Sequence, residues 1–261
     1  MDLNDFDAVA KDYDYFLPAL GLYSNGLEEF HLSLAEKYGK EGILDIACGT
    51  GVLTIPLIES GYDVTAFDLS SQMIEITRNK LQKENLHADL FIANMIDFNI
   101  DRKFSLAIIA RSGFMYLLTA KEQRQTLSNI REHLTDGGVL TFNTFQPYPT
   151  EQADCMKASL NEYVFRTEYT NHEGKKERIF KAATYDYLTQ IMRGSWKFET
   201  LDDAGNVVDT RICHQVTRQT YRQEMEYLFE LCGYEILDVY NDYCCNAAED
   251  HLIWVVRKLM P

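Results

Sequence analysis

A glycine-rich turn within residues 43–51, ILDIACGTG, has the residue types and spacing of a ligand-binding loop. Gly49 and Gly51 follow a short apolar run, and glycines between a strand and a helix let the backbone approach a nucleotide-like ligand. Asp45 lies just before the turn, where its carboxylate would repel a pyrophosphate and attract a ligand carrying an ammonium and a sulfonium. Thr54 replaces the third glycine of the dinucleotide fingerprint, so the pattern disfavours a dinucleotide.

Asp68 is a second carboxylate at the end of a predicted strand. It follows the glycine turn by about 20 residues, the distance expected for an acid that accepts hydrogen bonds from ribose hydroxyls. The alternative is that Asp68 caps the N-terminus of the next helix. Two carboxylates and a glycine turn at the carboxyl ends of neighbouring strands predict a pocket where the strand order of a sheet reverses.

The elements that would position these residues alternate between strand and helix patterns up to residue 145. Short apolar runs indicate strands, and apolar residues at helical spacing with capping signals indicate helices. The predicted strands are 43–47, 63–68, 90–93, 104–110 and 139–145, and the predicted helices are 28–38, 50–60, 70–84 and 121–134. Glycines at 137–138 are expected to end the last helix. This alternation is typical of a parallel sheet with helices on both faces.

The pattern changes after Pro149. Residues 160–217 are rich in Tyr, Phe, Thr and Val with period-two stretches, which predicts an antiparallel meander of about four strands. Three strands are placed at 163–167, 179–185 and 196–200, and turns at 171–174, 193–194 and 202–206. A helix at 221–231, closed by Gly233, and strands at 235–240 and 251–256 follow, so the meander interrupts the α/β unit.

Composition narrows the classes of partner. The formal net charge of −15 disfavours a nucleic-acid substrate, because an acidic surface repels phosphate backbones. No apolar run approaches the roughly 18 residues of a membrane helix, and the acidic N-terminus lacks the pattern of a secretory signal. We therefore expect a cytoplasmic protein that does not bind a membrane.

The six cysteines show no C-x-x-C pair and no regular spacing. We expect reduced, mostly buried thiols and no metal site. The adjacent residues Cys244 and Cys245 could bind a metal or oxidise, although neighbouring cysteines chelate a single zinc poorly.

An ordered set of motifs over residues 43–145 resembles the class I S-adenosylmethionine-dependent methyltransferases. The matching segments are DIACGTG at 45–51, FDLS at 67–70 with Met73, ANMIDF at 93–98 and LTDGG at 134–138. Tyr13-Asp14 with Tyr23, and the meander, further resemble the small-molecule branch of glycine N-methyltransferase-like and amino-sugar N,N-dimethyltransferase-like enzymes.

The resemblance implies an α/β fold, a Rossmann-like seven-stranded methyltransferase sheet whose last strand is antiparallel, with an inserted antiparallel β-meander lid. Residues 1–40 would form an N-terminal helical lid segment, residues 41–148 and 218–261 the Rossmann-like cofactor-binding domain, and residues 149–217 the β insertion over the substrate. The methyl donor would be S-adenosyl-L-methionine, the product S-adenosyl-L-homocysteine and the acceptor a small molecule. We expect a monomer or a homodimer.

The resemblance also assigns residues to the cofactor. These are Tyr13, Tyr23, Asp45, Ala47, Gly49, Gly51, Asp68, Leu69, Met73, Asn94, Met95, Ile96 and Ala110. Asp45, Ala47 and Gly49 would hold the methionine moiety, and Asp68 the ribose. Leu69 and Met73 would pack the adenine, with Asn94 and Met95 at its edge. The family usually has Asp at the position of Asn94, so an uncharged and weaker contact is expected there.

Tyr13 and Tyr23 would close over the cofactor, unless they are ordinary interface aromatics. For catalysis the resemblance points to Tyr13 and to Arg111 and Tyr116 in the loop after the fourth strand. Relatives often have His where Tyr116 stands, and tyrosine, with a pKa near 10, is a poor base at neutral pH. A neutral amine that needs only orientation suits this loop best. Arg111 could pair with an acceptor carboxylate or with an acid such as Asp136.

Three alternatives remain open. An O-methyltransferase would need a base near the acceptor, for instance His214 or His251. A non-catalytic protein would bind S-adenosylmethionine with its acceptor cavity filled by side chains. A protein or RNA methyltransferase would need a charged groove, which the acidic composition disfavours. The fourth strand is not followed by [DN]-P-P-[YF], which argues against methylation of nucleic-acid bases.

Overall fold

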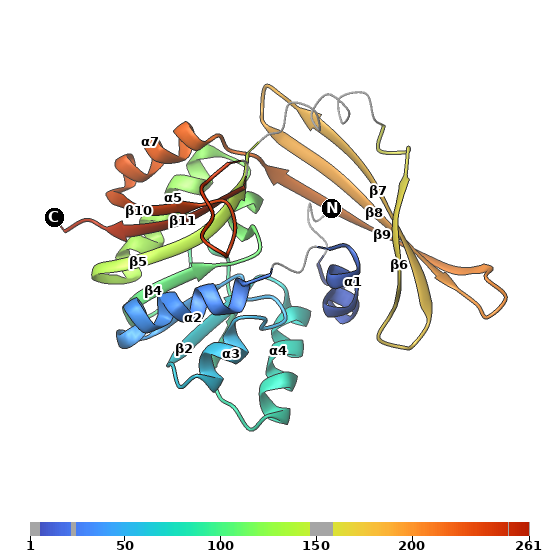
Figure 1. Cartoon of the computed structure of the whole chain (residues 1–261), viewed down its shortest axis with the longest axis horizontal. Helices are drawn as coiled ribbons and strands as arrows, with labels where there is room; N and C mark the ends of the chain where they lie inside the picture. The colour runs from blue at the N-terminus through green and yellow to red at the C-terminus, as the bar shows by residue number, and fades with distance from the viewer. Residues whose placement is uncertain (1–5, 22–24, 147–158, 250, 261) are drawn as a thin grey trace. The chain divides into compact units, whose positions relative to one another are not determined.

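The computed structural model describes residues 6–21, 25–146, 159–249 and 251–260. The chain divides into two compact units (Figure 1). The larger combines Asn25–Pro147 with Gln219–Pro261, and the smaller combines Met1–Ser24 with Tyr148–Arg218. The sequence predicts one N-terminal segment over residues 1–40. The structure divides this stretch, because its second helix packs into the core of the larger unit.

The larger unit is built on a seven-stranded sheet with the strand order β10-β11-β5-β4-β1-β2-β3. Its strands are β1 (Ile43–Ile46), β2 (Val64–Asp68), β3 (Asp89–Ile92), β4 (Phe104–Ile109), β5 (Leu134–Phe145), β10 (Tyr234–Tyr240) and β11 (His251–Lys258). β11 runs antiparallel to its neighbours β5 and β10, and the remaining pairs are parallel. The predicted seven-stranded sheet with an antiparallel last strand is confirmed.

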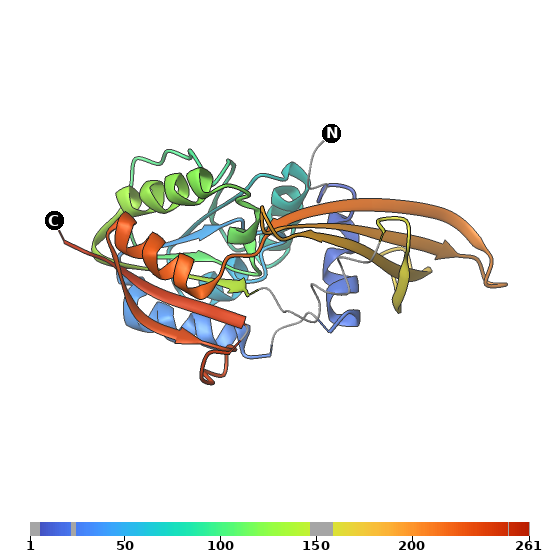
Figure 2. The same ribbon diagram turned by 90° about the horizontal axis from the view of Figure 1, so that it is seen from above.

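Helices cover both faces of this sheet. They are α2 (Leu27–Tyr38), α3 (Thr54–Glu59), α4 (Ser71–Lys83), α5 (Ala120–His133) and α7 (Arg222–Cys232). Successive residues of β4 alternate between the faces, because side chains of a strand point to opposite sides. Ala107 and Ile109 pack in the cluster that contains α5 and α7, while Leu106 and Ile108 pack with α2, α3 and α4. Figure 2 shows α5 and α7 on the side of the sheet opposite to α2. None of the described helices has the length and apolar character that crossing a bilayer requires.

The predicted glycine stop of the helix at 137–138 is wrong. Helix α5 ends at His133, Leu134 is already extended, and β5 continues through both glycines. Phe104 of β4 pairs with Leu134, but Leu106 pairs with Val139, so residues 135–138 form a bulge. Gly137, at φ +73°, therefore serves a bulge inside the strand and not a helix cap.

The smaller unit contains an antiparallel four-stranded sheet, which confirms the predicted meander. Its strands are β6 (Val164–Thr170), β7 (Lys176–Asp186), β8 (Ile191–Leu201) and β9 (Val207–Arg218), paired in that order. The predicted turn at 193–194 is wrong, because Gly194 lies within β8. The chain turns at residues 187–190 instead, where the Asp186 carboxylate accepts from the N–H of Leu188 and Gln190 adopts φ +60°.

The first helices of the chain pack on this second sheet. They are η1 (Ala10–Asp12) and α1 (Tyr13–Ala19), and Phe16 of α1 contacts Phe198 of β8 edge-on at 5.3 Å. Beneath them, the guanidinium of Arg211 donates to the carboxylates of Asp12 at 2.9 Å and Glu177 at 2.7 Å. Both carboxylates are buried, so this ion-pair network holds the N-terminal residues to the sheet.

Candidate active site

The loop after β1 has a backbone that only a few residues tolerate. Ala47, Gly49 and Gly51 all have positive φ, at 55°, 57° and 82°. A Cβ on Gly51 would lie 2.8 Å from the Cγ2 of Thr77, so close packing against α4 requires glycine there. A Cβ on Gly49 would meet nothing within 4 Å, so the loop has open space at this position. The loop therefore leaves room beside its half-buried backbone at Gly49.

Helix α4 fixes this loop from the other side. The hydroxyl of Thr77 donates to the carbonyl of Gly49 at 2.8 Å, and the ammonium of Lys80 donates to the carbonyl of Thr50 at 2.8 Å. Ser70 caps the helix by accepting from the N–H of Met73 at 3.1 Å. The loop is thus held rigidly at the carboxyl ends of β1 and β2.

Asp45 is a buried carboxyl beside this loop. It is about 1% exposed and accepts a hydrogen bond from the hydroxyl of Thr54 at 2.6 Å. Burial, opposed by the Thr54 hydrogen bond and assisted by the charge of Asp68, raises the pKa of Asp45 to about 7. A carboxyl in this state gains most from a nearby cation, which would restore its charge.

Asp68 links the first motif to the second. Its Oδ2 accepts from the N–H of Gly49 at 2.9 Å, and its Oδ1 accepts from the N–H of Ser70 at 2.8 Å. The helix is capped by Ser70, so the alternative role of Asp68 as N-cap is wrong. An ionised carboxylate has about four lone-pair sites and only accepts hydrogen bonds, so Asp68 is a group of the kind that hydroxyl donors require.

The residues assigned to the adenine lie along the same edge of the sheet but differ in exposure. Leu69 is 68% exposed, whereas Met73 is buried in the first turn of α4. Asn94 is exposed, and its Oδ1 accepts from the N–H of Ile96 at 3.0 Å. Met95 and Ile96 are half-buried against the core. Leu69 and Asn94 are therefore the accessible members of the set.

The loop after β4 begins with an unusual backbone. Ala110 is buried, and Arg111 and Ser112 have left-handed φ values of 51° and 62°. The loop continues as η3 (Gly113–Tyr116), in which Tyr116 is half-buried. A Cβ on Gly113 would lie 3.4 Å from the Cβ of Ala47, so this loop and the glycine turn lie against each other.

Sequence reasoning missed several residues of this edge. In the sequence, Thr54 stands only in the place of a missing glycine, whereas in the structure its hydroxyl donates to the carboxylate of Asp45. Asn143 of β5 accepts from the N–H of Ser112 at 2.8 Å, and Tyr243 donates to Asn143 at 3.3 Å. The signal in the sequence is a carboxamide in a predicted strand whose other residues are apolar or threonine.

The remaining predicted residues belong to other parts of the chain. Tyr13 belongs to α1 and His214 to β9, both in the smaller unit. Tyr23 falls outside the described residues. Asp136, offered as a partner for Arg111, lies 3.6 Å from the ammonium of Lys258 at the start of β5, far along the strand from the β4 loop.

No cluster of three potential metal-ligating side chains occurs among the described residues. The described cysteines are free thiols; Cys48, Cys213 and Cys232 are buried, and Cys244 and Cys245 are exposed. Cys48 lies within the glycine turn, and burial raises the pKa of its thiol well above the ordinary value.

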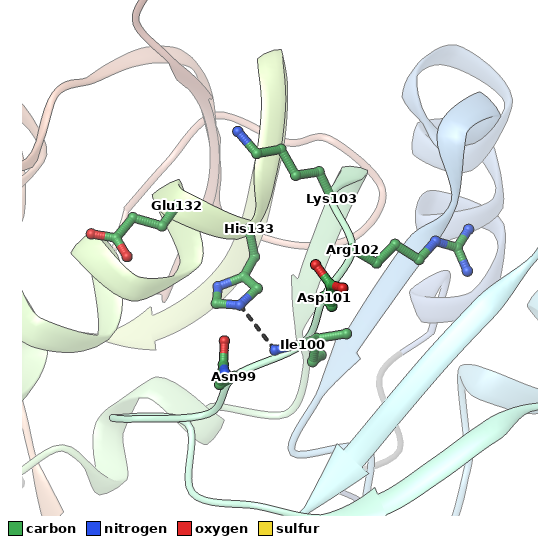
Figure 3. A pocket seen from close by; sticks show the side chains of 7 residues that line it. All are labelled: Asn99, Ile100, Asp101, Arg102, Lys103, Glu132 and His133. Carbon is green, nitrogen blue, oxygen red and sulfur yellow. Dashed lines mark hydrogen bonds between the residues drawn. The ribbon is translucent and has the colours of Figure 1, made fainter.

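A cavity of about 320 Å³ lies at the opposite, amino edge of the sheet (Figure 3). It is lined by residues 99–103, which precede β4, and by Glu132 and His133 at the end of α5. His133 Nε2 accepts from the N–H of Ile100 at 3.2 Å, and its Nδ1 donates to the carbonyl of Asn129 at 2.9 Å. Because both ring nitrogens are engaged, this histidine is a structural link and not a base.

Comparisons with known proteins show what this part of the chain is similar to. Residues 43–138 match the family model described as a methyltransferase domain. A protein of Geobacillus sp. (strain WCH70) named as a methyltransferase is 35% identical over 134 residues, which are 49% of this chain and 54% of that protein. The dTDP-3-amino-3,4,6-trideoxy-alpha-D-glucopyranose N,N-dimethyltransferase of Streptomyces venezuelae is 34% identical over 142 residues, 52% of this chain and 58% of that enzyme. The chain thus spans about half the length of these curated relatives.

The fold has a solved counterpart. The crystal structure of an S-adenosylmethionine-dependent methyltransferase from Clostridium acetobutylicum ATCC 824 superposes with a TM-score of 0.80 at 20% identity. The match covers 98% of this chain and 100% of that one, so the similarity of fold includes the four-stranded sheet.

Proposed function

We propose that this chain, whose residues 43–138 match a methyltransferase domain, transfers a methyl group from S-adenosylmethionine to a small-molecule amine. The observation that carries the proposal is the hydrogen bond of 2.9 Å between the N–H of Gly49 and the carboxylate of Asp68. It joins the glycine turn, the buried Asp45 beside it and the second carboxylate into one rigid edge.

The residues of this edge fit the donor chemically. Asp45 is a desolvated carboxyl whose charge an ammonium would restore. Open space at Gly49 admits a ligand chain beside the backbone. Asp68 is a carboxylate at this edge that could accept from hydroxyl groups, and the 68% exposed Leu69 offers apolar surface to an aromatic base. A pyrophosphate would fit poorly, because both carboxyls would repel it.

Each residue then has a role in binding or orientation. Asp45, oriented by Thr54, would hold the ammonium, and Asp68 would hold the ribose hydroxyls. Asn94 would accept at the adenine edge. When bound, S-adenosylmethionine supplies an electrophilic methyl group on a sulfonium, which needs alignment with its nucleophile more than activation.

The acceptor would lie at the loop after β4. Tyr116 and Arg111 are half-buried there, and the loop lies against Ala47 of the glycine turn. With tyrosine in place of a base, the loop suits an amine that arrives with its lone pair free. The Streptomyces venezuelae relative, named as an amino-sugar N,N-dimethyltransferase, is consistent with an amine. The roles of Tyr13 and of the four-stranded sheet as a lid stay predictions.

A second candidate is O-methylation. His251 at the start of β11 lies at the same edge of the sheet as the β4 loop, 3.0 Å from Asn143. Burial lowers the pKa of His251 below its ordinary 6.5, against a hydrogen bond to the backbone of Asn241 and the charge of Asp242. The ring is therefore neutral at pH 7, as a general base requires, but its Nε2 faces the carboxamide of Asn143 and would have to leave that contact to take a proton.

Calorimetric titration with S-adenosylmethionine and S-adenosylhomocysteine tests the proposal. We expect dissociation constants well below about 1 mM, and weaker binding by roughly 1–3 kcal/mol for Asp68→Ala. Asp63→Ala is the matched control, because Asp63 precedes the same strand at its other end and its exposed carboxylate pairs with Arg102. Methyl-release assays over amines, amino acids and phenols then identify the acceptor class. Absence of binding to the wild type, or equal affinity in both variants, would contradict the assignment.

A further inference from the structure

A polar cluster lies at the carboxyl edge of the seven-stranded sheet, where β5, β11 and the β4 loop meet. Asn143 of β5 is its centre: its Oδ1 accepts from the N–H of Ser112 at 2.8 Å, and its Nδ2 donates to the Oγ of Ser112 at 2.7 Å. The same Nδ2 lies 3.0 Å from Nε2 of His251. One carboxamide therefore joins the acceptor loop to a histidine.

Hydrogen-bond polarity fixes the state of this histidine. A backbone N–H can only donate, so the atom of Asn143 that faces Ser112 N must be the carbonyl oxygen Oδ1. The atom facing His251 is then the amide nitrogen Nδ2, which also can only donate. Nε2 of His251 must accept, and the ring must be neutral with its proton on Nδ1.

The groups around His251 favour this neutral state. The ring stacks on Phe145 at 4.5 Å, and Tyr243 contacts it edge-on at 6.2 Å. Burial lowers the pKa of His251, while a hydrogen bond to the backbone of Asn241 and the charge of Asp242 act in the opposite direction. Across the cluster, the charge of Arg111 acts on Tyr243, whose phenol is kept protonated by burial.

The acceptor loop depends on Asn143 because its backbone is strained. Arg111 and Ser112 are consecutive non-glycine residues with φ of 51° and 62°, a conformation that L-residues adopt rarely and that the surroundings must enforce. The two hydrogen bonds between Asn143 and Ser112 hold the backbone in this conformation. A charged imidazolium would present Nε2–H to Nδ2–H, and rotating the carboxamide to relieve that clash would turn Nδ2 toward the N–H of Ser112.

We propose that neutral His251 is a positioning residue for methyl transfer, which through Asn143 holds the Arg111–Ser112 turn and releases it when protonated. The inference rests on the proposed function, because it takes the β4 loop as the acceptor loop. The methyl-transfer rate should therefore have an acid limb that follows the ionisation of His251, and cofactor affinity should not share that midpoint.

Nuclear magnetic resonance of ¹⁵N-labelled protein tests the arrangement without an acceptor. We expect unprotonated Nε2 and protonated Nδ1 for His251 at pH 7.5, with the signal assigned by its loss in His251→Gln. The amide resonance of Ser112 should shift on acidification with the same midpoint as the ring. A protonated Nε2 at pH 7.5, or a Ser112 amide that ignores the titration of His251, would overturn the proposal.

In Asn143→Asp, protonation of His251 should strengthen its contact with residue 143, whereas in the wild type it should break that contact. A carboxylate still accepts from the N–H of Ser112 but now accepts from Nε2–H as well, so the midpoint of His251 should rise by about one unit or more. The Ser112 amide should then stay constant while the wild-type loop is released. Asn99→Asp adds the same charge at the opposite edge and should leave the midpoint in place. A midpoint that falls or stays in Asn143→Asp contradicts the proposal.

His251→Gln provides the test in the working enzyme. The glutamine oxygen can accept from Nδ2 of Asn143 but does not titrate, so the limb of kcat at the midpoint found for the His251 ring by nuclear magnetic resonance should disappear, while transfer at pH 8 persists. A limb retained at that midpoint in this variant, with S-adenosylmethionine still bound, overturns the role of His251. A wild type that fails to bind S-adenosylmethionine instead overturns the proposed function, and the two failures are distinct.

Discussion

Glu177 in the four-stranded sheet and Asp45 in the seven-stranded sheet are both about 1% exposed, yet their surroundings differ. Glu177 accepts from the guanidinium of Arg211 and from the neutral donors Tyr169, Asn171 and Thr200, at 2.5–3.0 Å. Asp45 is held by one neutral residue, Thr54, and burial raises its pKa to about 7. A cation already compensates the first carboxylate, whereas the second has a neutral partner and a neighbouring negative charge.

The difference separates a structural carboxylate from a binding carboxylate. Leaving a buried charge without compensation is costly, so a fold that retains one keeps it for a ligand that supplies the missing charge. Asp12 belongs with Glu177: burial alone would raise its pKa, but hydrogen bonds from His172 and Arg211 outweigh it and hold the pKa below 3.8. Lowering the pH should therefore weaken the ion pairs of Asp12, which need an ionised carboxylate. The same change should remove the cost of a buried negative charge at Asp45.

Removal of Arg211 should have the largest effect. Arg211→Met leaves Asp12 and Glu177 buried without their cation, which should lower the free energy of unfolding by about 3–5 kcal/mol. Urea denaturation measures the loss in the free energy of unfolding, and hydrogen exchange shows whether β7 and β9 lose protection. Lys175→Met is the control, because Lys175 forms an exposed pair with Glu173 and its loss should matter little. Equal stability of the two variants would remove the distinction between the carboxylates.

Asp45→Asn should show the opposite behaviour in the unliganded protein. Between about pH 4 and 7 the unfolded carboxyl ionises while the folded one stays protonated, so rising pH lowers wild-type stability by up to roughly 4 kcal/mol. The amide keeps the Thr54 hydrogen bond and abolishes this loss. The difference in unfolding free energy between variant and wild type should grow from pH 4 to 7 and then level off. A variant less stable than the wild type at pH 7.5 would show that Asp45 is structural.

The same residue should make cofactor binding depend on pH. If an ammonium binds the ionised form of Asp45, affinity for S-adenosylmethionine should fall by about tenfold per unit below pH 7 and be constant above it. Calorimetry from pH 6 to 8 measures this, and Thr54→Val should move the midpoint upward because its hydroxyl favours the charged form. Asp45→Asn should bind weakly at every pH. A flat wild-type profile would separate Asp45 from the ammonium.

Asn94→Asp should have the smallest effect. The new carboxylate keeps the hydrogen bond from the N–H of Ile96 and gives the adenine edge a charged acceptor. Charged hydrogen bonds are stronger than neutral ones, so affinity for S-adenosylmethionine should rise by about fivefold, roughly 1 kcal/mol. Asn99→Asp controls for added charge. An equal gain in affinity in both variants would show that the effect comes from the added negative charge of the protein as a whole and not from a contact with the adenine.

Much of the fold could be predicted from local patterns. The apolar runs at β1 and β4 and the alternation of the meander reflect burial. Burial selects apolar residues, so it leaves a pattern that can be recognised in the sequence. The bulge at Gly137 could not be predicted, because a glycine after a helix signals a cap equally well until the pairing of Phe104 with Leu134 is known. The turn at Gln190 could not be predicted either, because Gly194 nearby is the stronger turn signal in the sequence and yet lies inside β8.

The residues of the candidate site also divide into those that local motifs predict and those that only the fold brings together. Asp45, Gly49 and Asp68 lie in motifs whose spacing along the chain reflects their spacing in the sheet. Asn143 and His251 meet only through the antiparallel pairing of β5 with β11, over a separation of 108 residues. Such a contact has no local signal, so sequence reasoning could offer His251 as one of two histidines but could not choose between them.

The side chain of Gln146 has a consequence for making chimaeras. Its Oε1 accepts from the N–H of Arg222 at 3.2 Å and its Nε2 donates to the carbonyl of Glu249, so the two points where the inserted sheet leaves and rejoins the larger unit are close together. We therefore expect that the insertion can be exchanged between related chains as a cassette. Because Arg211 pairs with Asp12, that cassette must be encoded by two separate stretches of the gene, and an exchange of the insertion alone would leave a buried charge unmatched.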